Sequence, residues 1–317
     1  MNDPQIQFDQ ILETFPHSVR NLLKEIPGHR GILPARLCKE IINILGTQID
    51  DLMVRLLPVA ALYAVVPISD FRVGAVAGAD TSTEGNAYDL YLGANIEFRG
   101  LPLNQSVHAE QAVVMNAWMQ GATRVRTIAV SAAPCGYCRQ FLNELAGSNT
   151  LDIIIPTDEI GGFSQISLSK LLPKAFGPRD LDQETGLMVS KEDDDSLFLR
   201  VVVEDKLVLE ALSAAMHCYS PYTHNRAGCA IQTADGLTYT GRYAENAAFN
   251  PSLSPLQAAV SCMNMGHLSE EKKITRAVLV EKPSGIGQRG VTEMILKSIA
   301  PGIELEYYEA EGTTNRH

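Results

Sequence analysis

His108 and Glu110, with Cys135 and Cys138 further along the chain, could bind a metal ion and transfer protons. They lie in the segments His108-Ala109-Glu110 and Pro134-Cys135-Gly136-Tyr137-Cys138. One imidazole and two thiolates provide three zinc ligands and leave the fourth position to water, whereas a structural zinc is closed by four ligands. The nearby carboxylate could take a proton from that water. These residue types therefore predict a catalytic zinc centre.

The elements that carry these residues must bring them to one point. Cys135 and Cys138 are three positions apart, so a helical turn places both thiols on one face, and Pro134 suits the entry to a helix. A helix N-terminus favours the thiolate form that zinc requires. His108 opens an apolar run that predicts a buried helix. Glu110 reaches the same point as His108 only in the first turn of that helix.

Parts of the pattern have other interpretations when taken singly. A lone C-x-x-C could be a redox pair or half of a structural zinc knuckle, and His108 alone could be a core histidine. A zinc scaffold without catalysis would leave Glu110 unexplained. The order H-x-E, then a gap that holds a helix and a strand, then P-C-x-x-C is the signature of zinc-dependent nucleobase deaminases.

The residues around this signature resemble cytidine deaminases. The resemblance rests on residues 106–111 and 133–141, and further similar segments are 71–75, 93–98, 175–178 and 243–251. The chain resembles the long, two-domain, homodimeric branch of the family. This resemblance implies a three-layer α/β/α fold with a mixed sheet, present in duplicate. It also implies one Zn²⁺ per chain and hydrolytic conversion of cytidine and deoxycytidine to uridine and deoxyuridine with release of ammonia.

The resemblance also implies roles for single residues. The zinc ligands would be His108, Cys135 and Cys138, and Glu110 would move protons. Asn95 and Glu97 would bind the ribose 3′-hydroxyl, Phe71 would pack on the base or sugar, and the backbone near Ala109 and Cys135 would read the pyrimidine edge. Phe176 and Phe249 would help to close the site, with the dimer interface as one route. Without the family pattern, Asn95, Glu97 and Phe71 would be interpreted as a strand-end carboxamide, a surface carboxylate and a core aromatic.

Local patterns predict an order of helices and strands. We expect helices over 19–25 and 35–54 (broken at Gly46), strands over 72–79 and 90–96 joined by a polar turn at 80–86, and the zinc helix. A strand over 127–132, the cysteine helix to 145 and a strand over 151–155 follow. The predicted domains are an N-terminal helical segment (1–48), a catalytic domain (49–181), a linker (182–200) with the acidic run 192–195, and a degenerate non-catalytic domain (201–317).

The second half repeats the first in degraded form. Residues 221–228 align with 67–74, 241–245 with the strand that ends at Glu97, 254–260 with 108–114, and 276–280 with 126–130. Ser254 replaces the histidine, Leu256 replaces the acid, and 284–287 replace the cysteine pair. His217, His224 and His267 could suggest another metal site, but they lack thiols and suitable spacing. The repeat therefore predicts a second copy of the fold without zinc.

Composition limits the partners. The chain has 317 residues, 45% of them hydrophobic, and a formal net charge of −11. This charge disfavours binding to a phosphate backbone. It also counts against a nucleic-acid editing deaminase, which needs a basic groove. It does not disfavour an uncharged nucleoside as substrate. A nucleotide or a free base as substrate stays open. The N-terminal sequence lacks a signal-peptide pattern and no apolar run has membrane-spanning length, so we expect a cytosolic protein without membrane contact. The other four cysteines are expected to be buried and unpaired.

Overall fold

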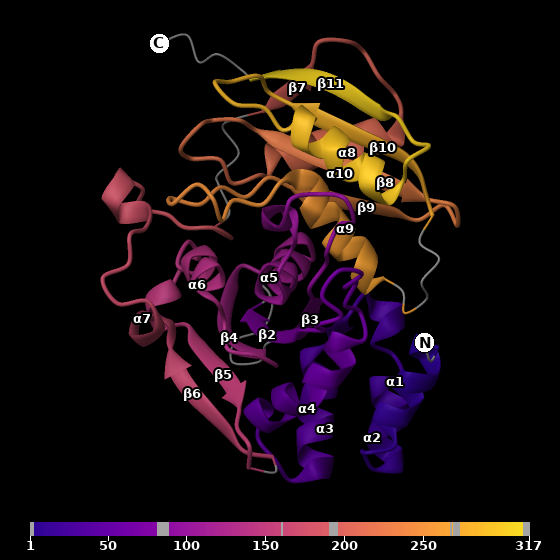
Figure 1. Cartoon of the computed structure of the whole chain (residues 1–317), viewed down its shortest axis with the longest axis vertical. Helices are drawn as coiled ribbons and strands as arrows, with labels where there is room; N and C mark the ends of the chain where they lie inside the picture. The colour runs from indigo at the N-terminus through magenta and orange to yellow at the C-terminus, as the bar shows by residue number, and fades with distance from the viewer. Residues whose placement is uncertain are drawn as a thin grey trace.

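Two mixed β-sheets form the frame of the molecule, one above the other in Figure 1. The computed structural model describes residues 3–80, 89–159, 161–189, 196–266, 268 and 273–312. The first sheet has the strand order β1-β3-β2-β4-β5-β6 and the second β7-β11-β10-β8-β9. The strands are β1 (Ile32–Leu33), β2 (Gly74–Asp80), β3 (Asp89–Ala94), β4 (Arg124–Val130), β5 (Asp152–Pro156), β6 (Phe163–Ser167), β7 (Leu197–Leu199), β8 (Ala227–Thr233), β9 (Thr238–Arg242), β10 (Ile274–Glu281) and β11 (Leu305–Gly312).

Helices cover both faces of each sheet. They are α1 (Pro4–Leu12), α2 (His17–Leu23), α3 (Ala35–Leu45), α4 (Ile49–Ala61), α5 (Ala109–Met119), α6 (Gly136–Leu142), α7 (Leu168–Leu171), α8 (Lys206–Met216), α9 (Pro255–Met265) and α10 (Arg289–Ile299). In β2, Ala75 and Ala77 face the core that contains α5, whereas Val76 faces the core of α1 to α4. This alternation follows from the two-residue period of a strand. The result is the expected three-layer α/β/α arrangement.

The N-terminal helices complete the outer layer of the first sheet. Phe8, Leu12 and Val19 are buried in the same core as Leu56 of α4. Helix α3 ends at Gly46, which adopts the left-handed conformation with φ of 61°, as helix C-termini often require. The predicted break at Gly46 is confirmed. Residues 3–48 therefore share a hydrophobic core with the sheet that follows them.

The second half repeats the topology of the first. The central strands run in the order β3-β2-β4-β5 in the first half and β9-β8-β10-β11 in the second. In both halves the first two pairings are antiparallel and the third is parallel. The match extends to single hydrogen bonds, because Glu97 Oε2 accepts from the amides of Ile68 and Ser69, and Glu245 Oε2 accepts from those of Tyr222 and Thr223. The predicted duplication of the fold is confirmed.

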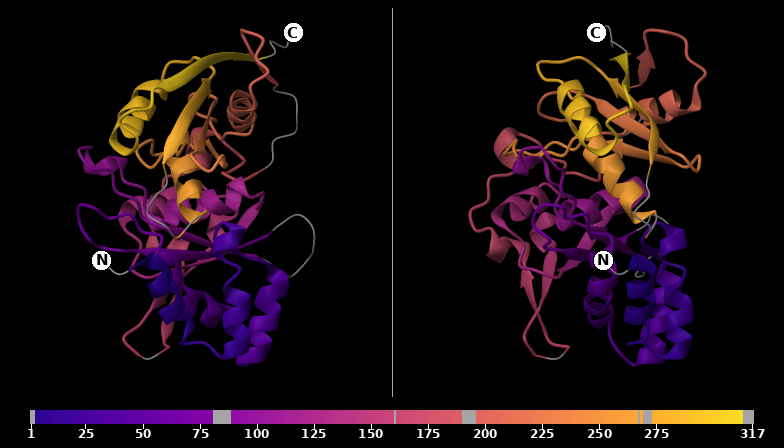
Figure 2. Two further views of the ribbon diagram at one scale, coloured as in Figure 1. Left: turned by 90° about the vertical axis from the view of Figure 1, so that its right-hand side faces the viewer. Right: turned by 45° about the vertical axis from the view of Figure 1, so that its right-hand side comes forward.

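The two halves contact each other through α5 and α9, which lie between the sheets (Figures 1 and 2). Gln111 Nε2 of α5 donates to Pro251 O at 3.3 Å, and Gln257 Nε2 of α9 donates to Gln105 O at 2.7 Å. Pro251 lies three residues before Ser254, the residue that precedes α9, and Gln105 lies three residues before His108, the residue that precedes α5. The two contacts are therefore reciprocal. Both halves share one central hydrophobic core.

Several predicted boundaries were wrong. The helix expected to end at residue 54 continues to Ala61, because its buried residues extend the apolar stripe over the sheet. The cysteine helix ends at Leu142 and not at 145, because the amides of Glu144 and Leu145 bond to carbonyls three residues back. The strand expected from 127 begins at Arg124, where it pairs with Asp80. Strands β2, β3 and β5 lie within two residues of expectation.

Some predictions fall on parts of the chain that the structure does not describe. Residues 81–86 of the polar turn, the acidic run 192–195 and His267 lie outside the described residues. Cys38, Cys218, Cys229 and Cys262 are buried and form no disulfide among the described residues, in agreement with the prediction. Within the described ranges, every helix falls short of the length and apolar character needed to cross a bilayer.

Candidate active site

His108, Cys135 and Cys138 converge in space. Their ligand atoms all lie within 4.8 Å of one another, with His108 Nδ1 at 3.6 Å from Cys135 Sγ and 3.2 Å from Cys138 Sγ, and the two sulfurs at 3.6 Å. Tetrahedral zinc with Zn–S of about 2.3 Å and Zn–N of about 2.0 Å places such atoms roughly 3.5–3.8 Å apart. The two 3.6 Å separations fit that geometry, and the 3.2 Å distance from His108 to Cys138 is slightly shorter than it requires. Among the described residues this is the group of three that could hold a metal ion.

Two helix N-termini position the three side chains. His108 is the residue before the first turn of α5, and Gln111 Oε1 accepts a hydrogen bond from its amide at 3.1 Å. Cys135 occupies the same position before α6, where its sulfur accepts from the amide of Cys138 at 3.5 Å. Both sequence-predicted helix starts are confirmed. The partial positive charge at these termini favours a thiolate.

The cysteine pair favours one thiolate even without metal. Hydrogen bonding with Cys138 lowers the pKa of Cys135 to about 5, although burial opposes this effect. The shared hydrogen bond and burial raise the pKa of Cys138 in turn. The hydrogen bond between the two sulfurs therefore favours the thiolate form of Cys135, which is the form in which a cysteine binds a metal.

Glu110 lies in the first turn of α5, where the sequence places it beside His108. Its side chain is only 4% exposed, and burial raises its pKa above the ordinary carboxyl value. A general acid–base group works best when its pKa lies near the operating pH, so a raised carboxyl pKa favours proton transfer in both directions. The geometry thus places a buried carboxyl group next to the three side chains that could hold a metal ion.

A pocket of about 350 Å³ opens onto these groups. This volume lies within the range of small-molecule sites. The predicted residues Phe71, Asn95, Glu97, Ala109, Glu110, His108 and Cys135 all line it, whereas the buried Cys138 does not. Ser69, Leu103 and Ser106 also line it and were not predicted. No distinctive sequence pattern marks these three residues, because they are ordinary turn and loop residues near the two motifs.

Asn95 and Glu97 hold the loop that forms one wall of the pocket. Asn95 Oδ1 accepts from the amide of Val73 at 2.9 Å, and its Nδ2 donates to Phe71 O at 2.9 Å. Burial raises the pKa of Glu97, but hydrogen bonds from Ser69 and from the backbone outweigh this and lower it. An amide and a carboxylate have more hydrogen-bonding sites than these contacts use. Both side chains therefore retain capacity for a ligand hydroxyl.

The predicted aromatic residues are exposed. Phe71 is 61% exposed at the pocket mouth, so it is not the core aromatic that its residue type alone would indicate. Phe176 and Phe249 are 47% and 65% exposed and do not line the pocket within this chain. Phe249 has a positive φ of 62°, an uncommon conformation for a bulky residue. The structure brings Phe71 to the pocket but not the other two.

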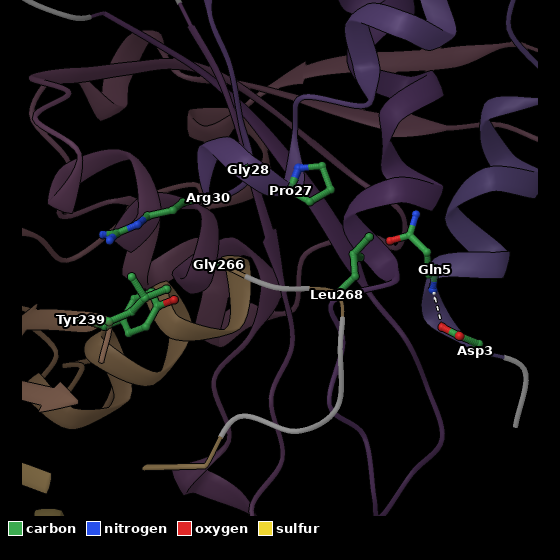
Figure 3. Close-up of a pocket in the computed structure, with 9 residues that line it drawn as sticks. Asp3, Gln5, Pro27, Gly28, Arg30, Tyr239, Gly266 and Leu268 are labelled. Carbon is green, nitrogen blue, oxygen red and sulfur yellow. Dashed lines mark hydrogen bonds between the residues drawn. The ribbon is translucent and has the colours of Figure 1, made fainter. Parts of the chain in front are cut away.

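A larger pocket of about 690 Å³ lies elsewhere, between the N-terminal segment and the second half (Figure 3). Arg30 stacks its guanidinium 5.0 Å above the ring of Tyr239 there, and Asp3 bonds to the amide of Gln5. The described lining residues contain no histidine, cysteine or buried carboxylate. Size alone therefore does not identify the chemical site of this molecule.

The second half carries other residues at the positions that align with His108, Glu110 and the cysteine pair. Ser254 occupies the position before α9 that His108 occupies before α5, and Leu256, fully buried, stands for Glu110. The loop at 284–287 leads into α10 without thiols. His217 Nδ1 is hydrogen-bonded to Ser213 O at 2.7 Å. No group of three metal-binding side chains forms among the described residues of this half.

Comparisons with known proteins match this chain to one family. A model described as the cytidine and deoxycytidylate deaminase zinc-binding region matches residues 47–151, and a second model of the same description matches 168–293. A cytidine deaminase of Photorhabdus laumondii is 41% identical over 96% of this chain and 99% of its own. One from Vibrio cholerae is 39% identical over 95% and 98%. A crystal structure of cytidine deaminase from Burkholderia pseudomallei shows 28% identity, covering 39% of this chain and 97% of its own, with a TM-score of 0.34.

The extent of these matches shows the family. The chain belongs to the cytidine and deoxycytidylate deaminase family, whose models describe a zinc-binding region. Within it, the chain has the long, two-domain form, since the relatives match over nearly their full length and the fold is present twice. The cofactor is Zn²⁺, and the His/Cys/Cys cluster of the first half fits it.

Proposed function

We propose that this protein catalyses zinc-dependent hydrolytic deamination of cytidine and deoxycytidine to uridine and deoxyuridine, as part of pyrimidine salvage. The observation that carries the proposal is the placement of a buried carboxylate beside a His/Cys/Cys cluster in one pocket. The names of the full-length relatives support the same reaction.

In this proposal His108, Cys135 and Cys138 are the zinc ligands. Three protein ligands leave a position for water, and zinc bound there would lower the pKa of that water toward neutrality. Two thiolates offset the charge of the ion, so the water is only moderately acidic and a separate base is needed. Glu110 is the base that the chain supplies.

Glu110 moves the protons of the reaction. Water adds to C4 of the pyrimidine, and ammonia leaves from the same carbon. Glu110 takes the proton of the attacking water and delivers it to ring N3. It then takes the proton of the new C4 hydroxyl and gives it to the departing amine, so that C4 becomes a carbonyl and ammonia leaves. Its raised pKa suits it to both directions of transfer.

The pocket walls bind the nucleoside. Asn95 and Glu97 hold the ribose 3′-hydroxyl with the hydrogen-bonding capacity left after they have fixed the 68–73 loop. The backbone at Ala109 and Cys135 reads the polar edge of the base. Phe71, exposed at the mouth, packs on the base or sugar.

We further propose that the protein is a cytosolic homodimer in which Phe176 and Phe249 help to close the site of the partner subunit. Large apolar side chains are exposed around the pocket, namely Ile68, Phe71 and Leu103. Exposed apolar groups gathered beside a site favour a covering partner.

A substrate panel tests the reaction. Cytidine, deoxycytidine, dCMP, cytosine and a cytosine-containing oligonucleotide should be compared by ammonia release and by loss of the cytosine absorbance. Turnover of the two nucleosides above the others supports the proposal. Preference for dCMP, the free base or the oligonucleotide would move the substrate to another class, and inactivity of the zinc-loaded protein on all of them would support a scaffold.

A further inference from the structure

The second half of the chain contacts α6, the short helix that carries the two cysteines, near both of its ends. The contacts come from one loop, residues 246–251, which follows β9. Near the start of α6, Tyr137 Oη donates to Asn250 O at 3.0 Å. The same loop accepts from α5 through Gln111 and Pro251. The loop thus touches both helices that bring the metal-binding side chains together.

Asn246 caps the C-terminal end of α6. The last carbonyls of a helix lack intrahelical partners, and the amide of Glu144, which would otherwise bond to Gln140 O, bonds to Phe141 O at 3.1 Å. Asn246 Nδ2 donates to Gln140 O at 3.0 Å. In return, Gln140 Nε2 lies 3.4 Å from Asn246 Oδ1. Asn246 is fully buried, so water does not replace these bonds.

Glu144 strengthens the attachment just beyond the helix. Its side chain is fully buried and accepts three hydrogen bonds, all from the second half. Tyr219 Oη donates at 2.8 Å, the amide of Ala247 donates at 2.9 Å, and Tyr222 Oη donates as well. A buried carboxylate held by three donors fixes the chain that follows α6.

The loop is itself held in one conformation. Asn246 Oδ1 accepts from the amide of Ala248 at 3.0 Å, and its backbone amide donates to Ser252 Oγ at 2.9 Å. Phe249 N donates to Asn246 O at 2.8 Å. These bonds let the loop act on α6 as a preorganised surface. Helix α6 has only seven residues, and so short a helix depends on tertiary contacts for its stability.

We propose that the 246–251 loop of the second half positions the cysteine helix, with Asn246 as the main positioning residue. By fixing α6, the loop fixes Cys135 and Cys138 relative to His108. It thereby slows the loss of zinc and holds the metal at a constant position relative to Glu110. The inference rests on the proposed function, because it takes those three residues as the zinc ligands.

The test is Asn246→Asp in the zinc-loaded, full-length protein. The substitution keeps the acceptor for the Ala248 amide and sets an oxygen against Gln140 O. Zinc transfer to an excess of a chelating indicator should become about tenfold faster, since groups that orient metal ligands typically affect metal affinity or activity by about 10–100-fold. The kcat for cytidine should fall while KM stays nearly unchanged, because the ribose-binding residues are on other elements.

A matched control is Asn264→Asp. Asn264 is also buried and donates from the second half to a first-half carbonyl, that of Tyr63, which follows α4. Both variants should lose thermal stability, but Asn264→Asp should release zinc at the wild-type rate. Unchanged zinc release in Asn246→Asp, or equal acceleration in both variants, would overturn the proposal.

Two further variants keep the outcomes separate. If Asn246→Asp does not fold, Tyr222→Phe replaces it in the test, because it removes one hydrogen-bond donor to Glu144. Faster zinc release from this variant supports the proposal. Zinc release at the wild-type rate overturns it. Cys138→Ala tests the ligands directly. Full zinc occupancy in that variant would refute the ligand assignment, whereas a zinc-free Cys138→Ala with unchanged release from Asn246→Asp refutes the positioning role alone.

Discussion

Glu110 is the residue on which the proposed reaction depends. Glu110→Ala should keep zinc and fold but lose at least about a thousandfold in turnover, since one carboxylate performs several proton transfers, each usually worth roughly 10²–10⁴. Glu110→Gln should behave similarly, because it keeps the shape and removes the base. Initial rates on cytidine together with metal analysis check this. Near-normal turnover with zinc retained would falsify the assignment.

Cys138 should contribute to stability as well as to metal binding. Its side chain is fully buried beside Glu110 and His108. Cys138→Ala should lower both zinc content and Tm, because the free energy of metal binding adds to that of folding. Metal analysis and thermal unfolding with and without added zinc measure the two effects. Cys229→Ala, which changes a buried cysteine far from the cluster in sequence, should leave zinc content unchanged.

Single residues differed in how well they could be predicted. The His/Cys/Cys group and Glu110 follow from short spacings at helix starts, which local sequence determines. Asn95 and Glu97 depended on the family resemblance, since strand ends often carry polar residues. Ser69 was missed because its contact with Glu97 joins residues 28 positions apart, and no local pattern encodes such a pairing.

At the scale of elements, two glycines allow the helices between the sheets to approach their strands. A Cβ added at Gly93 in β3 would lie 2.3 Å from the amide nitrogen of Val113 in α5, and one at Gly241 in β9 would lie 2.3 Å from that of Ala259 in α9. Either alanine should cost about 1–3 kcal/mol or more, since overpacking forces the backbone to move. Unfolding by denaturant measures this loss.

The same two variants distinguish an effect on stability from an effect on the active site. Gly93→Ala displaces the helix that begins after His108, so activity per folded molecule should also fall. Gly241→Ala displaces α9, which contacts α5 but carries none of the proposed ligands, so it should lower that activity less than Gly93→Ala does. Equal specific activity in both variants, at a temperature where both are folded, would show that the β3–α5 distance does not govern the site.

Strands β2, β3 and β5 were predicted within two residues, whereas α4 continues well past its predicted end at residue 54 to Ala61. The repeat could also be recognised from sequence, because glycine and apolar positions recur at nearly constant offset. Helix α1, strand β6 and the true end of α6 were missed. They are short or end by tertiary contacts, as α6 does against Asn246, and propensity does not determine such ends.

At the scale of the whole molecule, the second half should be needed for folding. The central core is shared, with Val113 and Met115 of α5 in the same cluster as Leu256 and Ala259 of α9. Residues 1–181 expressed alone should be insoluble or inactive, because they would expose an apolar face of a kind that monomers rarely expose. Solubility and the cytidine assay test this. A truncated monomer with full activity would refute the structural role of the second half.

The intact protein should contain one zinc per chain and sediment as a dimer. The second half lacks His108, Glu110 and cysteine equivalents, so it should take up no zinc of its own. Metal analysis and analytical ultracentrifugation measure the two values. Two zinc ions per chain, or an active monomer, would contradict this assembly. The reciprocal placement of the halves was beyond sequence reasoning, because it depends on contacts between residues 140 or more positions apart, such as Gln111 and Pro251.

The cap that Asn246 places on α6 belongs to the same polypeptide as the helix it holds. A covalently linked partner acts at an effective concentration set by the connecting chain and not by the amount of protein present. Dilution that would separate two free subunits therefore leaves this contact intact. Fusion of the two copies makes this part of the support around each site independent of expression level, and an enzyme scarce in its cell would keep its cysteine helix in place.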